Sequence, residues 1–259
     1  MKKSTSIVNN IIPYVTALVV LLVWEIAVRW NQLPAYILPG PLQIVKTLKE
    51  TLPLLLNHTA STLEEAMLGF GLAIVIALVT AFILNHFDWL NQAVYPLLIV
   101  SQTIPIITLA PLFLIWFGWG MLPKILVVIL VCFFPIVISL LNGLNSVDPD
   151  LISLFRSMGA SKLVIFKMVK LPSAMPGLFS GMKISASYSI MAAVIGEWLG
   201  AQQGLGYFMT IAQKSFRVDR ALAAVVIIAI LSLLIVKVID LAEWLLTPWN
   251  RRQKEWEIK

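Results

Sequence analysis

The sequence is poor in charged residues. Asp, Glu, Lys and Arg make up 12% of its 259 residues, hydrophobic residues make up 59%, and the mean hydropathy is +0.91. A soluble domain carries about 25% charged residues. So little charge is compatible with a folded protein only if lipid covers much of its surface. We therefore expect a membrane protein without a separate soluble domain.

Cysteine, histidine and catalytic motifs are also scarce. The single cysteine, Cys132, lies in an apolar run and is interpreted as a small core residue. His58 and His86 lack the spacing of metal ligands, and we interpret both as loop residues. The sequence has no G-x-x-x-x-G-K-S/T phosphate loop and no G-x-S-x-G, zinc or haem motif. We therefore expect no catalytic residue, no metal site and no bound cofactor. The chain is not expected to be an enzyme, and a partner must supply its energy.

The net charge of +6 would suggest a nucleic-acid partner in a soluble protein. Here the Lys and Arg residues lie in short loops beside apolar runs, which is the positive-inside pattern of membrane proteins. The side that holds both termini receives more of these cations than the opposite side. We predict that both termini are cytoplasmic and that the partner surface is a lipid bilayer, with no nucleic acid.

Six apolar runs are long enough to cross a bilayer as helices. We predict an all-α polytopic membrane protein with a single domain over residues 1–259. A cleaved signal peptide is the alternative for the first run, but that run continues through Trp24 without a convincing cleavage site. The predicted spans are 11–28, 61–84, 93–117, 124–141, 175–198 and 221–246.

The segment before the second span is predicted to be a polar linker, with a short surface helix over 43–56. Ser61 and Glu64 have the spacing of a capping box, which would begin the second span there. Three prolines interrupt the third span, and Ser101, Gln102 and Thr103 cluster beside one of them, Pro105. These three polar residues either form a constriction on a transport route or join helices by hydrogen bonds, and both interpretations stay open.

The fifth span has a small residue at every fourth position, which predicts a close helix–helix interface. Ser185, Tyr188 and Ser189 in the same span are further candidates for a translocation pathway. The small residues are Gly177, Gly181, Ser185, Ser189 and Ala193.

Acidic residues near the ends of spans are interpreted as structural. Glu25 and Arg29 are expected to form an ion pair four residues apart. Glu197 is expected to be an interfacial carboxylate in water. The set of Lys237, Asp240 and Glu243 is expected to be a self-paired polar stripe at the membrane boundary.

Segment 148–172 is the one long segment that is both amphipathic and rich in basic residues. Asp148 is expected to cap a helix that begins at Pro149. Gly159 is expected to end that helix in a left-handed conformation, and Ser161 to cap a second short helix. The segment lies between two apolar runs, so a membrane protein would present it to water.

The first of these helices has an apolar face that needs a partner outside the lipid. Leu171-Pro172 is expected to close the unit, because the residue before proline is disfavoured in the α region. The apolar face consists of Leu151, Leu154, Phe155 and Met158.

This segment resembles the cytoplasmic loop of bacterial ABC importer permeases, whose pattern is EAA-x3-G-x9-I-x-LP. Gly159 matches the glycine, Val169 stands for the isoleucine and Leu171-Pro172 matches the end, whereas Ser153-Leu154-Phe155 replaces Glu-Ala-Ala. Further likenesses are Pro39-Gly40-Pro41, PLFLIWFGWG over 111–120, GLNSVDPDL before the loop, and AAVIGEWLGAQQGLGY over 192–207. They are similar to the branch that includes permeases for nitrate, sulfonates, taurine and thiamine pyrimidine precursors.

The resemblance implies a type I ABC importer permease in the bacterial inner membrane, with alternating access. It implies two copies of this permease, two ATPase subunits that bind ATP and Mg, and an extracytoplasmic substrate-binding protein. The ATPase would contact the loop, including Gly159, Ala160, Leu171 and Pro172, and the substrate would be a small organic solute. A self-contained secondary transporter or channel is the alternative, and it would need ionisable groups near the middle of the membrane. An inert scaffold subunit of a membrane complex is a third possibility.

Overall fold

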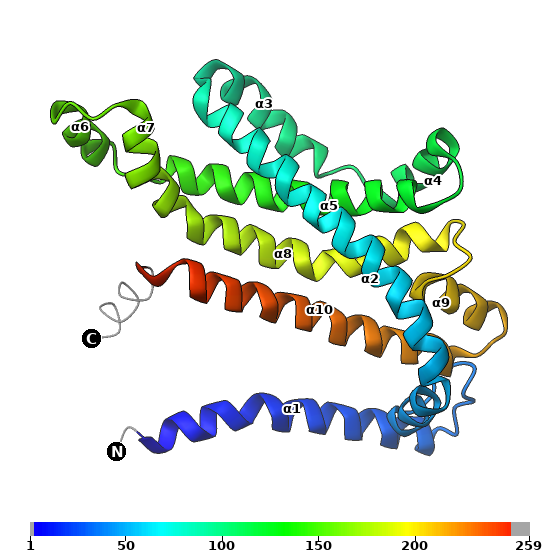
Figure 1. Ribbon diagram of the computed structural model, residues 1–259. Helices are drawn as coiled ribbons and strands as arrows, with labels where there is room; N and C mark the ends of the chain where they lie inside the picture. The colour runs from blue at the N-terminus through cyan, green and yellow to red at the C-terminus, as the bar shows by residue number, and fades with distance from the viewer. Residues whose placement is uncertain (1–2, 250–259) are drawn as a thin grey trace.

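The computed structural model describes residues 3–249, with side chains from residue 11 onward, and this part of the chain is helical without a strand (Figure 1). Five helices are long and apolar enough to cross a membrane. They are α1 (Lys3–Trp30), α2 (Pro41–His86), α5 (Met121–Asn145), α8 (Leu171–Trp198) and α10 (Val218–Leu246). The sequence-based prediction of an all-α membrane protein is confirmed.

A sixth span is formed by two helices, α3 (Asp88–Ser101) and α4 (Ile106–Phe117), if they are counted together. Their axes differ by 99° at a short break that contains Pro105. Of the three prolines predicted to interrupt this span, Pro105 lies at the break, whereas Pro96 and Pro111 lie inside α3 and α4. The span is a sharply bent pair and not one helix over 93–117. A proline lacks the N–H that would continue the helix, so the backbone turns there.

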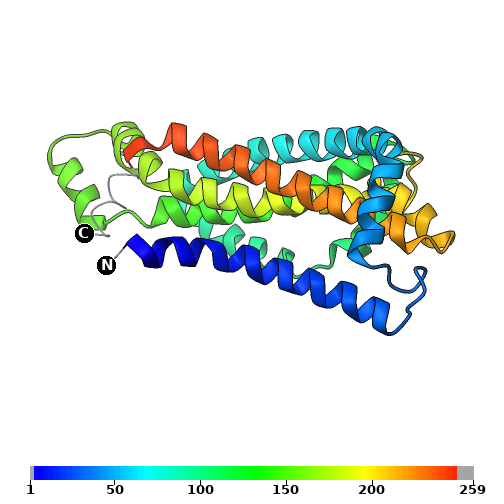
Figure 2. The ribbon, with the colours of Figure 1, turned by 90° about the horizontal axis from the view of Figure 1, so that it is seen from below.

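Shorter helices lie at the two ends of the bundle (Figures 1 and 2). At one end are α6 (Pro149–Ser157), α7 (Lys162–Ile165) and a π-helical turn, η1 (Phe166–Lys170). At the other end is α9 (Leu205–Lys214). The start of α1 and the end of α10 lie at the same end as α6 and α7. The described ends of the chain thus lie at the same end of the bundle as α6 and α7, and the cytoplasmic placement of this end stays a prediction.

The close packing of α5 against α8 follows from small residues. A Cβ atom at Gly181 would come 2.6 Å from the carbonyl oxygen of Pro135, and one at Gly177 would come 2.7 Å from that of Ser139. Only glycine allows the two backbones to approach so closely. Cys132 is fully buried in the same interface, as predicted. The pattern of small residues in the fifth span therefore correctly predicted a close helix interface, which is the one between α8 and α5.

The predicted boundary between a linker and the second span is wrong. Helix α2 runs without interruption from Pro41 to His86, through Pro53, and Ser61 lies inside it, so Ser61 and Glu64 form no capping box. Pro53 removes one backbone hydrogen bond. The helix continues because the same face stays packed on both sides of Pro53, where Thr47, Thr51, Leu55, Thr59 and Thr62 are buried at intervals of three or four residues.

The predicted end of the loop unit at Leu171-Pro172 is also wrong. Residues 162–198 form a continuous helical run, and Leu171 has α-helical angles of φ −64° and ψ −49°. The turn η1 is wider than an α-helix, and the N–H of Leu171 donates to the carbonyl of Phe166, five residues back. This wider turn gives the ring of Pro172 the room that a regular α-helix would deny it.

Two predicted ion-pair arrangements have different outcomes. The Glu25–Arg29 pair is confirmed, with 2.6 Å between Arg29 Nε and Glu25 Oε1. Asp240 and Glu243 form their ion pairs with another helix and not within α10 as predicted. Both carboxylates accept from Lys183 of α8, each at 2.5 Å, so they join α10 to α8.

Candidate functional site

The segment between α5 and α8 folds as its capping residues predict. Asp148 Oδ1 accepts from the N–H of Asp150 at 2.8 Å and caps α6. Gly159 has φ +80°, and the N–H of Ala160 donates to the carbonyl of Phe155 at 3.0 Å, which closes the end of α6. The hydroxyl of Ser161 accepts from the N–H of Val164 at 3.4 Å at the start of α7.

Helix α6 presents an apolar face that the rest of the described chain leaves largely uncovered. Leu154 is 55% exposed and Met158 is 75% exposed, Leu151 is also exposed, and Phe155 is half-buried. No residue of α6 is buried. Of the other residues predicted to contact an ATPase, Gly159 is exposed and Ala160 half-buried, whereas Leu171 and Pro172 lie within the continuous helix. The face therefore has the exposure that a docking surface requires.

The polar residues at the break between α3 and α4 mostly satisfy backbone groups nearby. The hydroxyl of Ser101 donates to the carbonyl of Leu98 at 2.9 Å, and that of Thr103 donates to the carbonyl of Val100 at 2.7 Å. Gln102 is exposed. These bonds replace helical hydrogen bonds that are lost at the break. The role of the three residues in a pathway stays a prediction.

The pathway candidates of α8 point in different directions. Ser185 and Ser189 are fully buried, with hydroxyls that donate to the carbonyls of Cys132 at 2.7 Å and Ala186 at 2.9 Å. Tyr188 is 46% exposed. Ser185 thus holds α8 to α5, while Tyr188 is the one of the three that can meet a solute, lipid or partner. The structure does not bring them together with Ser101, Gln102 and Thr103 in one hydrogen-bonded cluster.

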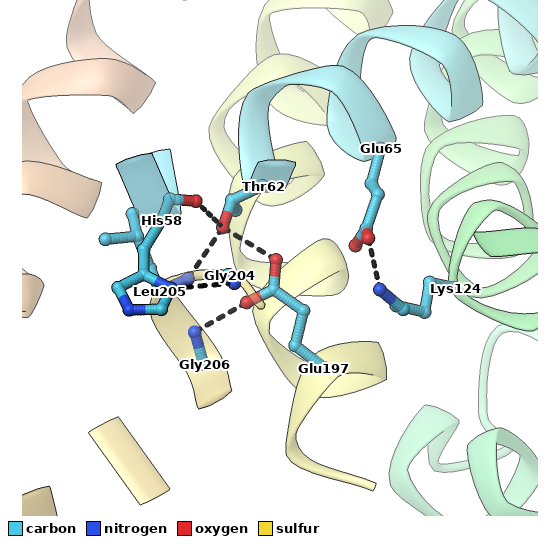
Figure 3. Close-up of polar contacts among 8 residues, drawn as sticks. All are labelled: His58, Thr62, Glu65, Lys124, Glu197, Gly204, Leu205 and Gly206. Atoms are coloured by element: carbon cyan, nitrogen blue, oxygen red, sulfur yellow. Dashed lines mark hydrogen bonds and ion pairs between the residues drawn. The ribbon is translucent and has the colours of Figure 1, made fainter. Parts of the chain in front are cut away.

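A buried polar cluster, which the sequence analysis missed, joins α2, α8 and α9 at the end opposite α6 (Figure 3). Glu197 of α8 is 1% exposed, and its two carboxylate oxygens have different partners. Oε1 accepts from the hydroxyl of Thr62 in α2 at 2.6 Å, and Oε2 accepts from the N–H of Gly206 in α9 at 2.5 Å. The prediction that Glu197 lies in water is therefore wrong.

The hydroxyl of Thr62 connects this cluster further, because it accepts from the N–H of Leu205 at 2.8 Å. His58 lies in α2 and not in a loop as predicted, and its Nδ1 accepts from the N–H of Gly204 at 3.1 Å. The start of α9 thus has three backbone N–H groups satisfied by side chains (Figure 3). They fix the loop between α8 and α9 against α2.

Beside this cluster, Lys124 of α5 pairs with Glu65 of α2 (Figure 3). The Glu65 side chain is 2% exposed and the Lys124 side chain is 13% exposed. Glu65 lies three residues after Thr62, so both side chains occupy one face of α2. That spacing, at the start of a predicted span, is the local signal that could have indicated a buried site.

The hydroxyl of Thr62, the carboxylate of Glu197 and the N–H groups of Leu205 and Gly206 all find partners within the cluster, as in a structural hydrogen-bond network. Within the described part of the chain, no group of three or more His, Cys, Asp or Glu residues is placed to hold a metal ion. The cluster and the neighbouring Lys124–Glu65 pair can hold α2, α5, α8 and α9 together at the end of the bundle opposite the exposed α6.

A family model described as the binding-protein-dependent transport system inner membrane component matches residues 69–252. The chain belongs to this family. It is an ABC importer permease, as the resemblance of segment 148–172 implied, and a multi-pass protein of the inner membrane. The match includes the exposed α6, the bent α3–α4 pair and the α5–α8 interface.

Several curated permeases are similar to this permease over most of its length. The formylaminopyrimidine transport permease protein ThiX of Halalkalibacterium halodurans is 36% identical, covering 93% of this chain and 96% of its own. The riboflavin transport system permease protein RibX of Chloroflexus aurantiacus is 35% identical, covering 91% and 89%. The putative aliphatic sulfonates transport permease protein SsuC of Bacillus subtilis is 29% identical, covering 90% and 85%.

The fold of this permease is also that of a solved importer. A chain of the MetNI methionine ABC transporter, in an inward-facing conformation, superposes with a TM-score of 0.65 at 23% identity. The superposition covers 75% of this chain and 96% of the other. The predicted type I ABC importer permease architecture is therefore confirmed at the level of the fold.

Proposed function

We propose that this permease forms, with a second copy of itself, the translocation pathway of an ATP-driven importer that works by alternating access. Two copies of a separate ATPase subunit bind ATP and Mg, and an extracytoplasmic binding protein delivers the solute. The α6 end and both termini lie in the cytoplasm. The relatives transport small organic solutes, which supports a thiamine pyrimidine precursor or an aliphatic sulfonate as the substrate.

The observation that carries this proposal is the exposed apolar face of α6. Leu151, Leu154 and Met158 are exposed at the bundle end where α1 begins and α10 ends, and α6 is held by its own caps, Asp148 and Gly159. An apolar helix face in water is stabilised when a partner covers it. ATP-driven closure of two ATPase subunits would move the two α6 helices and, through the continuous α7–η1–α8 run, the spans.

Energy transfer in this scheme follows from differential affinity. A ligand shifts a two-state equilibrium only by binding one state more tightly than the other. ATP bound to the ATPase pair would favour the outward-facing state, and hydrolysis would release it. The polar cluster of Thr62, Glu197 and Gly206 lies at the opposite end, where the outer gate of such a pathway would be.

The test is co-expression with the ATPase subunit encoded for the same importer, followed by purification through a tag on the permease. Phe155→Asp places a charge in the apolar face and should abolish recovery of the ATPase. Ser153→Asp adds the same charge to a different side of α6, and the complex should survive. Equal recovery with both variants would show that the apolar face does not dock the ATPase.

The same preparation separates this proposal from a secondary transporter. Purified permease alone, reconstituted in liposomes, should show no substrate flux driven by an ion gradient. Flux of formylaminopyrimidine or taurine without ATPase and ATP would favour the self-contained transporter instead.

A further inference from the structure

A cavity of about 480 Å³ lies between the underside of the α6–α7 segment and the turn that joins α2 to α3. Its volume is within the roughly 300–1,000 Å³ of small-molecule sites in proteins. Three cationic side chains line it, from three different elements: Arg156 of α6, Lys162 of α7 and Lys170 of η1. The cavity is therefore assembled by folding and not by one basic stretch of sequence.

These cations lack carboxylate partners. Within the described residues, neither Arg156, Lys162 nor Lys170 takes part in an ion pair, although the wall includes one acid, Asp88. Lys170 donates one hydrogen bond, to Asn85 Oδ1 at 3.1 Å. Three positive charges that line one hollow with a single acid repel one another. An anion that binds between them removes that repulsion and gains charge-assisted hydrogen bonds.

Asn85, His86 and Asp88 also line the cavity, and the remaining part of its wall is apolar. Phe82 and Phe166 meet edge to face with ring centroids 5.5 Å apart, and Ile165 is 5% exposed. A small hydrophilic anion gains nothing from such a surface. A ligand that has an anionic group joined to an apolar part would cover both halves of the cavity.

The position along the bundle matches the depth of lipid headgroups. The cavity lies where α2 ends and α3 begins, and the turn there exposes two aromatic side chains, Phe87 at 46% and Trp89 at 70%. Tryptophan is enriched at the membrane–water interface. Basic pockets between helices at that depth are suited to the headgroups of anionic lipids.

The cavity uses a different side of α6 from the docking face. Ile152 and Arg156, four residues apart, line the cavity. Leu151, Leu154 and Met158 lie on a side of the helix that is rotated by roughly 140° from them, at 3.6 residues per turn, and Phe155 lies between the two sides. An ATPase that contacts Leu151, Leu154 and Met158 therefore meets a different side of α6 from the one that lines the cavity.

We infer that this cavity binds the headgroup phosphate of an anionic phospholipid, with the phosphate among Arg156, Lys162 and Lys170 and the start of the acyl chains against Phe82 and Phe166. The bound lipid joins α6 and α7 to the α2–α3 turn. It thereby fixes the angle at which the docking face is presented. The inference uses the membrane placement of the family and rests on the proposed function only for the identity of the docking partner.

The test measures lipid binding to the purified full-length permease by native mass spectrometry, after removal of lipid with detergent. Phosphatidylglycerol is titrated onto wild type, onto Arg156→Gln/Lys162→Gln and onto the control Lys49→Gln/Lys214→Gln. The control removes the same charge from exposed positions on α2 and α9, away from the cavity. We expect the affinity of the cavity variant to fall at least about tenfold and that of the control to stay unchanged.

Two further titrations decide the chemistry of the ligand. Phosphatidylcholine, which is zwitterionic, should bind at least tenfold more weakly than phosphatidylglycerol, and excess inorganic phosphate should not displace the lipid. Equal loss in both double variants, equal binding of the two lipids, or displacement by phosphate would each overturn the inference. No transport is measured, so a negative result leaves the importer assignment standing.

Discussion

The hydroxyl of Thr62 lies 2.6 Å from a carboxylate oxygen of Glu197, although 135 positions separate the two residues in the sequence. The same hydroxyl accepts from the N–H of Leu205, so one side chain connects α2, α8 and the start of α9 (Figure 3). Both residues are buried. A buried polar group that loses its partner costs free energy, so this contact is stabilising only while it is complete.

Replacing Thr62 by Val should therefore destabilise the permease by about 1–3 kcal/mol. Val keeps the shape of the side chain but leaves both Glu197 Oε1 and the N–H of Leu205 without this partner. The free energy of unfolding in detergent, from denaturant titration followed by tryptophan fluorescence, gives the measurement. Thr103→Val is the control, because Thr103 is exposed and bonds only to a carbonyl three residues away. Equal losses in the two variants would contradict the importance of the cluster.

The buried pair of Lys124 and Glu65 should respond asymmetrically to substitution. Lys124→Met removes the cation and leaves a buried carboxylate, which should cost about 3–5 kcal/mol of stability. Adding Glu65→Leu removes that carboxylate, so the double variant should recover a large part of the loss. A double-mutant cycle on the unfolding free energy measures the coupling.

The exposed pair of Glu25 and Arg29 provides the comparison for this cycle. Arg29 is 68% exposed, and such pairs contribute only about 0–1 kcal/mol. Arg29→Met should therefore have a small effect. If Lys124→Met were equally mild, the carboxylate of Glu65 would have to find water or another donor in the folded protein.

Patterns within short stretches of sequence correctly predicted the helix ends around α6 and the helix interface of α8. Asp148, Gly159 and Ser161 act within a few residues of their own positions, and the small residues of α8 recur along one face. The buried cluster was missed because its partners are distant in sequence: Glu197 meets Thr62 across 135 positions. The spacing of residues within a short stretch of sequence cannot predict a contact between such distant positions.

The proline-based prediction at Pro172 failed for a related reason. A rule about proline compares a helix with an unfolded alternative in isolation. In α2 the buried face on both sides of Pro53 outweighs the lost hydrogen bond, and before Pro172 a π-helical turn makes room for the ring. At Pro105 no such compensation occurs, and the chain bends by 99°.

The α5–α8 interface predicts opposite results for two glycines in helices. Gly181→Ala would place a Cβ atom 2.6 Å from the carbonyl oxygen of Pro135, so the helices must separate and stability should fall by at least about 1 kcal/mol. Gly71→Ala meets nothing within 4 Å and should be neutral or slightly stabilising, because alanine favours the helix. Unfolding free energies of the two variants in the same detergent give the comparison. A neutral Gly181→Ala would mean that α8 shifts freely against α5.

The bend at Gly159 should be required for coupling and not for folding. Its φ of +80° is incompatible with proline, whose ring fixes φ near −65°, so Gly159→Pro must change the path from α6 to α7. We expect this variant to reach the membrane in normal amounts but to lose ATP-driven uptake. Gly159→Asn should retain most of the uptake, because asparagine tolerates the left-handed conformation, whereas Gly159→Val should lose it. No atom lies within 4 Å of a Cβ at this position, so space does not explain a difference between Asn and Val. The measurement is ATP hydrolysis and solute uptake by the complex in liposomes, and normal uptake by Gly159→Pro would show that the orientation of α6 does not transmit the energy.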